Sequence, residues 1–142
     1  MQVALIERIG VKQMTNENRP LIFVVDDETL ISRSLATILK QQGFSACDFN
    51  DPRRALEMAL ITPPDLLLSD VMMPYLSGIE LAIAMKKITP CKVLLFSGQA
   101  GTVDLLESAR NRGYDFELLH KPIHPAELLR EIRHSLPLEL CN

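Results

Sequence analysis

Five short apolar runs alternate with five segments of helical periodicity, and this alternation limits the possible folds more than any other feature of the chain. The first run, Leu21 to Val25, is continuous and rich in residues that favour strands, as in a strand buried on both faces. Strands that alternate with helices are joined by right-handed crossovers. The pattern therefore predicts an α/β fold, a doubly wound five-stranded parallel sheet with helices on both faces.

The bounds of these elements follow from local signals in the chain. A proline after Asp51 gives an N-cap with proline at the first helical position, and Gly43 and Pro63-Pro64 stop the helices before them. The expected strands are 21–25, 44–49, 65–70, 91–97 and 116–120. The expected helices are 29–40, 52 to about 61, 78–87, a segment after 101 that runs to about 112, and 125–135.

The length of 142 residues corresponds to one domain. A polar cluster, Thr15 to Pro20, separates a short apolar segment from the alternating pattern. We therefore expect an N-terminal extension over residues 1–19, one domain over 20–136 and a C-terminal tail over 137–142. No DNA-binding or catalytic output domain is expected after the last helix, so output is expected to pass through a partner protein.

Charge and composition exclude several classes of function. A net charge of −3 argues against direct binding of nucleic acid, and no apolar run approaches the ~20 residues that cross a bilayer. The three cysteines have wide, irregular spacing that fits neither a disulfide framework nor a zinc site. The first residues carry no basic leader before their apolar stretch. We therefore expect a cytoplasmic protein without a membrane span.

Polar residues gather at the ends of the predicted strands, namely Asp26, Asp27, Asp70, Ser97 and Lys121. The carboxyl ends of parallel strands meet at one edge of the sheet, so these side chains should converge. Clustered carboxylates repel one another, and an all-oxygen site of this kind suits Mg²⁺. A hydroxyl and a lysine beside that cation complete a cradle for a phosphoryl group.

Four motifs in this order resemble the receiver domains of bacterial two-component response regulators. The stretch Asp70–Leu81 has the pattern DxxMPxxxGxEL of their phosphorylation loop, and Val24–Glu28 resembles their acidic pair. Ser97-Gly98 and Lys121-Pro122 match the hydroxyl and lysine positions of the family. The resemblance covers about residues 20–135 and implies a flavodoxin-like receiver fold of the stand-alone type.

By this resemblance, Asp70 accepts a phosphoryl group from a phosphohistidine on a sensor histidine kinase or a histidine phosphotransfer protein. Ser97 would hydrogen-bond the transferred phosphoryl group and Lys121 would neutralise it. The chain would then signal to a downstream protein by a change of conformation, acting as a phosphoacceptor rather than an enzyme. The implied cofactor is Mg²⁺, held by Asp26, Asp27, Asp70 and the backbone carbonyl of Met72.

The sequence departs from the family at the residue three positions before Lys121. Many receivers carry there a Tyr or Phe that moves inward on activation, whereas this chain has Leu118. The interval from Gly113 to Lys121 is one residue longer than usual, so Phe116 could take the aromatic role in a shifted register. Both assignments stay open at this point.

Several other interpretations compete with the receiver hypothesis. Asp26 and Asp27 could cap the first helix, and the protein could be a pseudo-receiver that only binds partners. A phosphorelay shuttle that passes the phosphoryl group to a second histidine protein is equally compatible with the chain length. An aspartyl-phosphate phosphatase usually has a second acid two residues after its nucleophile, where this chain has Met72.

Overall fold

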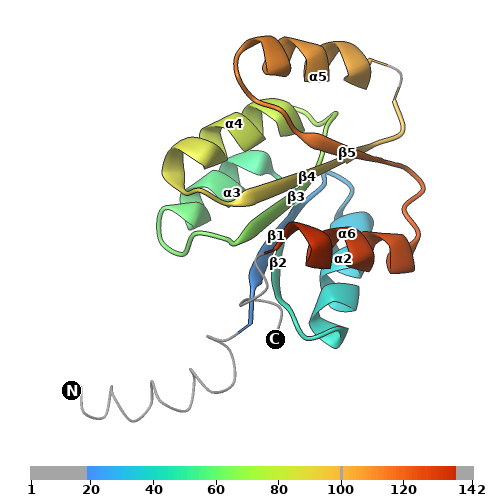
Figure 1. Ribbon diagram of the computed structural model, residues 1–142. Helices are drawn as coiled ribbons and strands as arrows, with labels where there is room; N and C mark the ends of the chain where they lie inside the picture. Colours follow the sequence, from blue (N-terminus) through green and yellow to red (C-terminus); the bar gives the residue numbers. More distant parts are fainter. Residues whose placement is uncertain (1–18, 100, 137–142) are drawn as a thin grey trace, which may run out of the picture.

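The computed structural model describes residues 19–99 and 101–136, and within them five parallel strands form one sheet in the order β2-β1-β3-β4-β5 (Figure 1). Every neighbouring pair of strands is parallel. The strands are β1 (Leu21–Val25), β2 (Ser45–Phe49), β3 (Leu66–Asp70), β4 (Lys92–Ser97) and β5 (Glu117–His120). The predicted doubly wound sheet is confirmed, and the predicted strand starts differ from the observed ones by at most one residue.

Within the described part of the chain, five helices cover the two faces of the sheet. Residues of α3, α4 and α5 pack with one set of strand side chains, and residues of α2 and α6 pack with the alternate set (Figure 1). The helices are α2 (Thr29–Gln41), α3 (Pro52–Ala59), α4 (Gly78–Ile88), α5 (Thr102–Asn111) and α6 (Pro125–Ser135). Because both faces are covered, the central strand β3 is buried along its whole length.

Local sequence signals explain where the helices begin. The Asp51 carboxylate accepts a hydrogen bond from the Arg53 N–H at 2.9 Å, and the Ser77 hydroxyl accepts one from the Glu80 N–H at 3.2 Å. Each bond satisfies an N–H group that has no partner within the helix. These caps place the start of α3 directly after β2 and the start of α4 close to the end of β3.

The end of α3 differs from the prediction by two residues, because the helix ends at Ala59 rather than near Ile61. The N–H groups of Ile61 and Thr62 both bond to the Met58 carbonyl, which forms a tight turn. The helical conformation is sterically disfavoured for the residue before a proline, so Pro63 sets a limit that α3 cannot pass. The turn at the Met58 carbonyl ends the helix before that limit.

The predicted extension and tail lie almost entirely outside the described residues, since residues 1–18 and 137–142 are not among them. The domain bounds 20–136 therefore stay a prediction. Among the residues that the structure does describe, no helix has the length and apolar character needed to cross a membrane.

Candidate functional site

Three aspartates meet at the carboxyl edge of the sheet, as the strand ends predict. Asp26 and Asp27 follow β1 and Asp70 ends β3, the strand beside it. Each offers a carboxylate oxygen, and these three atoms all lie within 4.8 Å of one another. Asp26 and Asp70 are buried, whereas Asp27 is exposed.

Lys121, the residue after β5, extends its ammonium group to the two buried carboxylates. Its Nζ lies 3.4 Å from Asp26 Oδ2 and 3.5 Å from Asp70 Oδ2. The same atom lies 5.1 Å from the centre of the Phe96 ring, at the distance of a cation–π contact. The residue that follows the fifth strand therefore supplies positive charge to the site, although Lys121 is 95 residues from Asp26 in sequence.

Burial governs the electrostatics of this cluster. Burial raises the pKa of Asp70 above its usual value, and the nearby Lys121 ammonium opposes that rise only in part. Burial also raises the pKa of Asp26, against the hydrogen bond that its carboxylate accepts from the Glu28 N–H at 2.9 Å. Although burial alone would lower the pKa of Lys121, the charges of Asp70 and Asp26 raise it. One lysine therefore leaves negative charge uncompensated at the site.

The donor set fits a hard divalent cation. Three carboxylates in one cluster provide oxygen ligands only, which is the ligand chemistry that Mg²⁺ accepts. A shallow cavity of about 340 Å³ opens beside them, and Met72 is among the residues that line it. The full lining is Asp27, Glu28, Asp70, Met72, Gly98, Gln99 and Lys121.

The helix-cap interpretation of the aspartate pair is not supported. The residue that precedes α2 is Glu28, and no side chain caps this helix by a hydrogen bond. Asp26 instead bonds the Glu28 N–H in the turn before the helix. The buried Asp26 carboxylate is therefore a member of the charged cluster with Lys121.

Gly78 allows the loop after Asp70 to close tightly. Its N–H donates to the Val71 carbonyl at 2.7 Å, and a Cβ atom at this position would overlap the Asp70 carbonyl oxygen. Only glycine lacks that atom. Glycine at the first position of α4 therefore lets the helix start lie directly against the backbone of Asp70.

Ser97 ends β4 at the same edge, but its hydroxyl group is directed elsewhere. Ser97 Oγ lies 2.7 Å from Thr102 Oγ1 and accepts a hydrogen bond from the Gln99 N–H at 3.0 Å. Ser97 is buried and is not among the residues that line the cavity beside Asp70. The structure thus brings together Asp26, Asp27, Asp70 and Lys121, with Ser97 beside them and turned toward α5.

Residues 22–133 match the sequence model of one protein family, the response regulator receiver domain. The match covers most of the chain and includes every residue of the cluster described above. The chain belongs to the response regulator receiver domain family. The resemblance to receiver domains inferred from the four motifs is thereby confirmed, and the stand-alone type stays a prediction.

Curated relatives of this receiver include longer regulators. The chain is 36% identical over 114 residues to the transcriptional regulatory protein PdtaR of Mycobacterium tuberculosis, covering 78% of this chain and 54% of that protein. It is 28% identical over 118 residues to the DNA-binding response regulator MtrA of the same species, covering 83% and 51%. The receiver therefore spans about half the length of the curated relatives it matches.

Solved receiver structures share the fold. A response regulator receiver domain protein from Clostridium thermocellum superposes with a TM-score of 0.72 at 28% identity, covering 82% of this chain and 93% of that one. The chemotaxis protein CheY4 of Vibrio cholerae gives a TM-score of 0.74 at 23% identity, covering 83% and 99%. At that lower identity the likeness concerns the fold alone.

Of the two residues that could take the aromatic position, Leu118 lies on β5 and Phe116 precedes that strand. Leu118 pairs in register with Leu95, two residues before Ser97 on β4, which is ~7 Å along the strand. Phe116 precedes β5, is buried, and stacks on Tyr114 with ring centres 6.0 Å apart. Leu118 is therefore nearer to Ser97 than Phe116 is.

Sequence reasoning missed three residues around the site. Glu28 and Gln99 line the cavity beside Asp70, and Thr102 is the hydrogen-bond partner of Ser97. A hydroxyl at the first position of a predicted helix was a visible signal for Thr102. The direction of the Thr102 hydroxyl depends on side-chain packing, which the spacing of residues in the sequence does not reveal.

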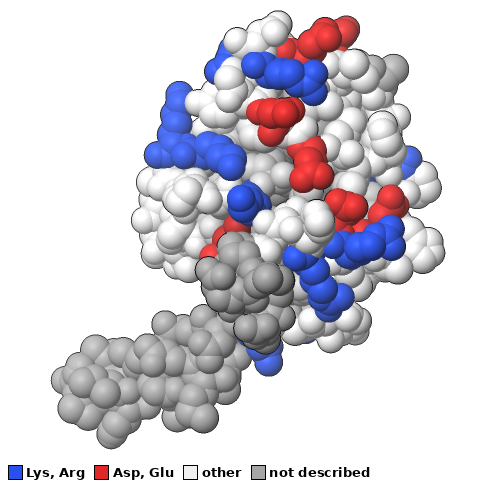
Figure 2. All heavy atoms as spheres, viewed as in Figure 1, with Lys and Arg blue, Asp and Glu red and all other residues white. Residues whose placement is uncertain are grey.

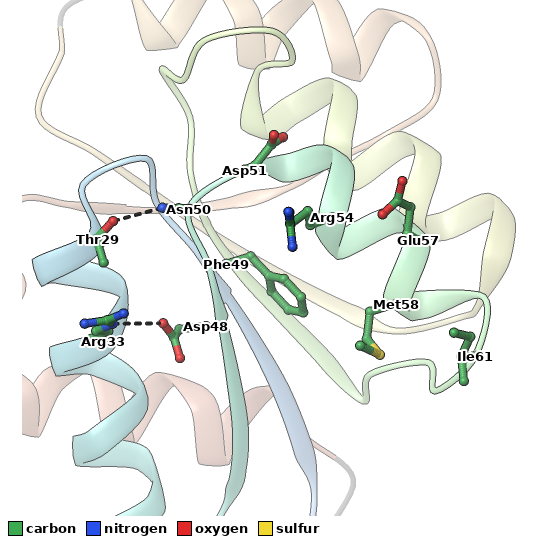
Figure 3. Close-up of a pocket in the computed structure, with 10 residues that line it drawn as sticks. All are labelled: Thr29, Arg33, Asp48, Phe49, Asn50, Asp51, Arg54, Glu57, Met58 and Ile61. Atoms are coloured by element: carbon green, nitrogen blue, oxygen red, sulfur yellow. Dashed lines mark hydrogen bonds and ion pairs between the residues drawn. The ribbon is translucent and has the colours of Figure 1, made fainter.

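A larger cavity of about 700 Å³ lies away from the acidic cluster, between α2 and α3 beside β2 (Figure 3). Arg33 and Asp48 form a long ion pair of 4.0 Å across it, and Asn50 donates to the Thr29 hydroxyl at 3.0 Å. Charged groups of both signs line it, so its chemistry favours no single class of ligand. The acidic cluster is the better candidate for the functional site.

Proposed function

We propose that this receiver is a phosphoacceptor, in which Asp70 takes a phosphoryl group from a phosphohistidine. The donor is a sensor histidine kinase or a histidine phosphotransfer protein. The observation that carries the proposal is the position of Asp70, a buried carboxylate 3.5 Å from the Lys121 ammonium and within a cluster of three acids. A surface aspartate that served only for solubility would have neither a lysine ammonium beside it nor two neighbouring carboxylates.

The proposed step forms a bond between an Asp70 carboxylate oxygen and phosphorus. The bond between phosphorus and the histidine nitrogen breaks, and that nitrogen keeps the electron pair. Lys121 offsets charge on the transferred oxygens, as cationic groups do in phosphoryl transfer. Ser97, after reorienting, donates a hydrogen bond to one of these oxygens.

The proposed cofactor is Mg²⁺, held by Asp26, Asp27, Asp70 and the Met72 carbonyl. When bound, the cation offsets the repulsion between the carboxylates and the incoming phosphoryl group. We assign Asp27 direct contact and Asp26 contact through water, because Asp26 is fully buried and already bonded to Lys121 and the Glu28 N–H. The protein is proposed to signal to a partner protein by changing conformation and to turn over no substrate of its own.

Direct contact with nucleic acid is not part of the proposal, although MtrA is named as a DNA-binding regulator. Figure 2 shows Lys and Arg side chains interspersed with Asp and Glu side chains on the face it presents, with no continuous basic surface there. Phosphate backbones are bound by clustered basic side chains. The DNA-binding property of the longer relative is therefore not transferred to this receiver.

The test uses phosphoramidate, a small donor whose phosphorus–nitrogen bond matches that of phosphohistidine. Wild type, Asp70→Asn and Asp104→Asn are incubated with it, with Mg²⁺ or with a chelator, and their intact masses are measured. Asp104 is an exposed carboxylate on α5 and serves as the matched control. We expect one added phosphoryl group on wild type and Asp104→Asn with Mg²⁺, and none on Asp70→Asn.

The alternatives give other results. Equal labelling of Asp70→Asn and wild type would contradict Asp70 as the acceptor. Absence of labelling on wild type, with Mg²⁺ binding intact, would favour the pseudo-receiver. Sustained hydrolysis of a small phosphate ester, lost in Asp70→Asn, would favour the phosphatase.

A further inference from the structure

The Ser97 hydroxyl is held by two partners that both lie on the side of α5. Its oxygen accepts a hydrogen bond from the Gln99 N–H at 3.0 Å and lies 2.7 Å from Thr102 Oγ1. A serine hydroxyl has one hydrogen to donate and two lone pairs to accept with. The bond from Gln99 occupies one lone pair of the Ser97 oxygen. In the contact with Thr102, Ser97 either donates its hydrogen or accepts with its second lone pair.

Thr102 is as deeply placed as Ser97. Both side chains are about 2% exposed, so water does not compete for either hydroxyl group. Thr102 is the first residue of α5, and the preceding residue, Gly101, has no side chain that could take over its bond. Among the described residues, no buried side-chain nitrogen or oxygen lacks a hydrogen-bond partner. The pair of hydroxyls is therefore satisfied internally, and separating it has a cost.

This arrangement opposes the role that the proposed function gives to Ser97. The cavity beside Asp70 is lined by Gly98 and Gln99 on this side, and Ser97 is not part of its lining. To donate to a phosphoryl group on Asp70, the Ser97 side chain has to turn and give up Thr102. Any energy that the hydroxyl pair contributes is then subtracted from the binding of the phosphoryl group.

We propose that Thr102 is a positioning residue, whose hydroxyl holds Ser97 away from Asp70 and so sets how readily the site accepts a phosphoryl group. This inference rests on the proposed function, because it concerns the same site. Removal of the Thr102 hydroxyl weakens the arrangement in which Ser97 faces Thr102. It leaves unaffected the arrangement in which Ser97 bonds the phosphoryl group. The effect is transmitted wholly through the Ser97 hydroxyl.

The test measures the affinity for beryllofluoride, a mimic of the phosphoryl group on aspartate, by calorimetry at constant Mg²⁺. Thr102→Val keeps the shape of the side chain and removes the hydroxyl, so we expect about fivefold tighter binding, equivalent to ~1 kcal/mol. Thr102→Ser retains the hydroxyl and should bind as wild type does. Thr62→Val, at an exposed threonine after α3, is the matched control and should also be unchanged.

A double-mutant cycle separates the inference from a general effect on packing. In a Ser97→Ala background, Thr102→Val should leave the affinity unchanged, because the hydroxyl that it releases is absent. Melting temperatures check that each variant folds. If Thr102→Val does not fold, the same comparison is made with Thr102→Ala.

Each result decides the matter. Unchanged or weaker binding by Thr102→Val would overturn the inference while leaving the proposed function in place, and so would an equal gain in the Ser97→Ala background. Weaker binding would mean that Ser97 and Thr102 move together as one unit. Binding that persists undiminished in Asp70→Asn, or fails in wild type, would overturn the proposed function and this inference with it.

Discussion

The Lys121 ammonium lies 3.5 Å from the Asp70 carboxylate and joins the residue after β5 to the last residue of β3. The contact does not neutralise the site, because the same ammonium also serves Asp26 at 3.4 Å. Burial outweighs the attraction to Lys121, so the pKa of Asp70 is raised. A carboxylate of this kind is less stable as an anion in the folded chain than in the unfolded one.

The raised pKa of Asp70 predicts how stability depends on pH when no metal is bound. Between the unfolded value, 3.8, and the raised folded value, the folded protein binds more protons than the unfolded chain. Stability is therefore lost as pH rises through this window. The Asn side chain of Asp70→Asn stays neutral at every pH, so this variant does not lose stability in the window. The difference in melting temperature between Asp70→Asn and wild type should therefore grow with pH through the window and then level off.

Melting temperatures of both proteins in chelator, between pH 4 and 8, check this expectation. Mg²⁺ should reduce the advantage of Asp70→Asn at neutral pH, because the cation relieves the strained wild-type site. A difference in melting temperature that is independent of pH, or that shrinks as pH rises, would show that the charge on Asp70 does not destabilise the fold.

Mg²⁺ should stabilise the fold through Asp27, the exposed acid of the cluster. A ligand that binds only the folded state at 100 times its dissociation constant adds about 2.7 kcal/mol to the free energy of unfolding. Asp27→Ala should lose most of that gain and should be at least as stable as wild type in chelator, since one source of repulsion is gone. Thermal unfolding with Mg²⁺ or chelator measures both effects, and Asp104→Ala is the control. A full Mg²⁺ gain in Asp27→Ala would remove Asp27 from the proposed ligands.

Gly78 should tolerate no side chain, because an added Cβ would overlap the Asp70 carbonyl oxygen. We expect Gly78→Ala to reduce the free energy of unfolding by about 1–3 kcal/mol, the usual cost of overpacking, and to weaken Mg²⁺ binding by shifting Asp70. Gly101→Ala is the matched control, since a Cβ there meets no atom within 4 Å. Chemical denaturation of the two variants compares them directly, and equal stability would mean that the loop after β3 adjusts without cost.

The fold was predictable because its signals are local and repeated. Leu21 to Val25 is apolar enough to require burial on both faces, and Asp51 with Pro52 specifies a helix start. The order of the strands then places Asp26, Asp27, Asp70 and Lys121 at one edge, since parallel strands end together. The exact end of α3 was not predictable, because a tight turn competes with one more turn of helix before Pro63.

Side-chain direction is the part of the site that spacing does not determine. Ser97 stands at the predicted edge, yet its hydroxyl bonds Thr102, because both are enclosed together at the start of α5. Tyr75 is a second case: it adopts a φ of 72° and places its ring 3.9 Å from the guanidinium of Arg53 on α3. A bulky residue rarely takes a positive φ, and no sequence pattern indicated this contact.

Chemical trapping of the acyl phosphate identifies the residue that carries the phosphoryl group, which we propose is Asp70. Wild-type protein labelled by phosphoramidate with Mg²⁺ is reduced with borohydride, which converts a phosphorylated aspartate to homoserine, and its peptides are sequenced by mass spectrometry. We expect homoserine at position 70 and unmodified Asp26 and Asp27. Homoserine at another aspartate, or a phosphoryl group on a serine, threonine or histidine with Asp70 intact, would contradict it.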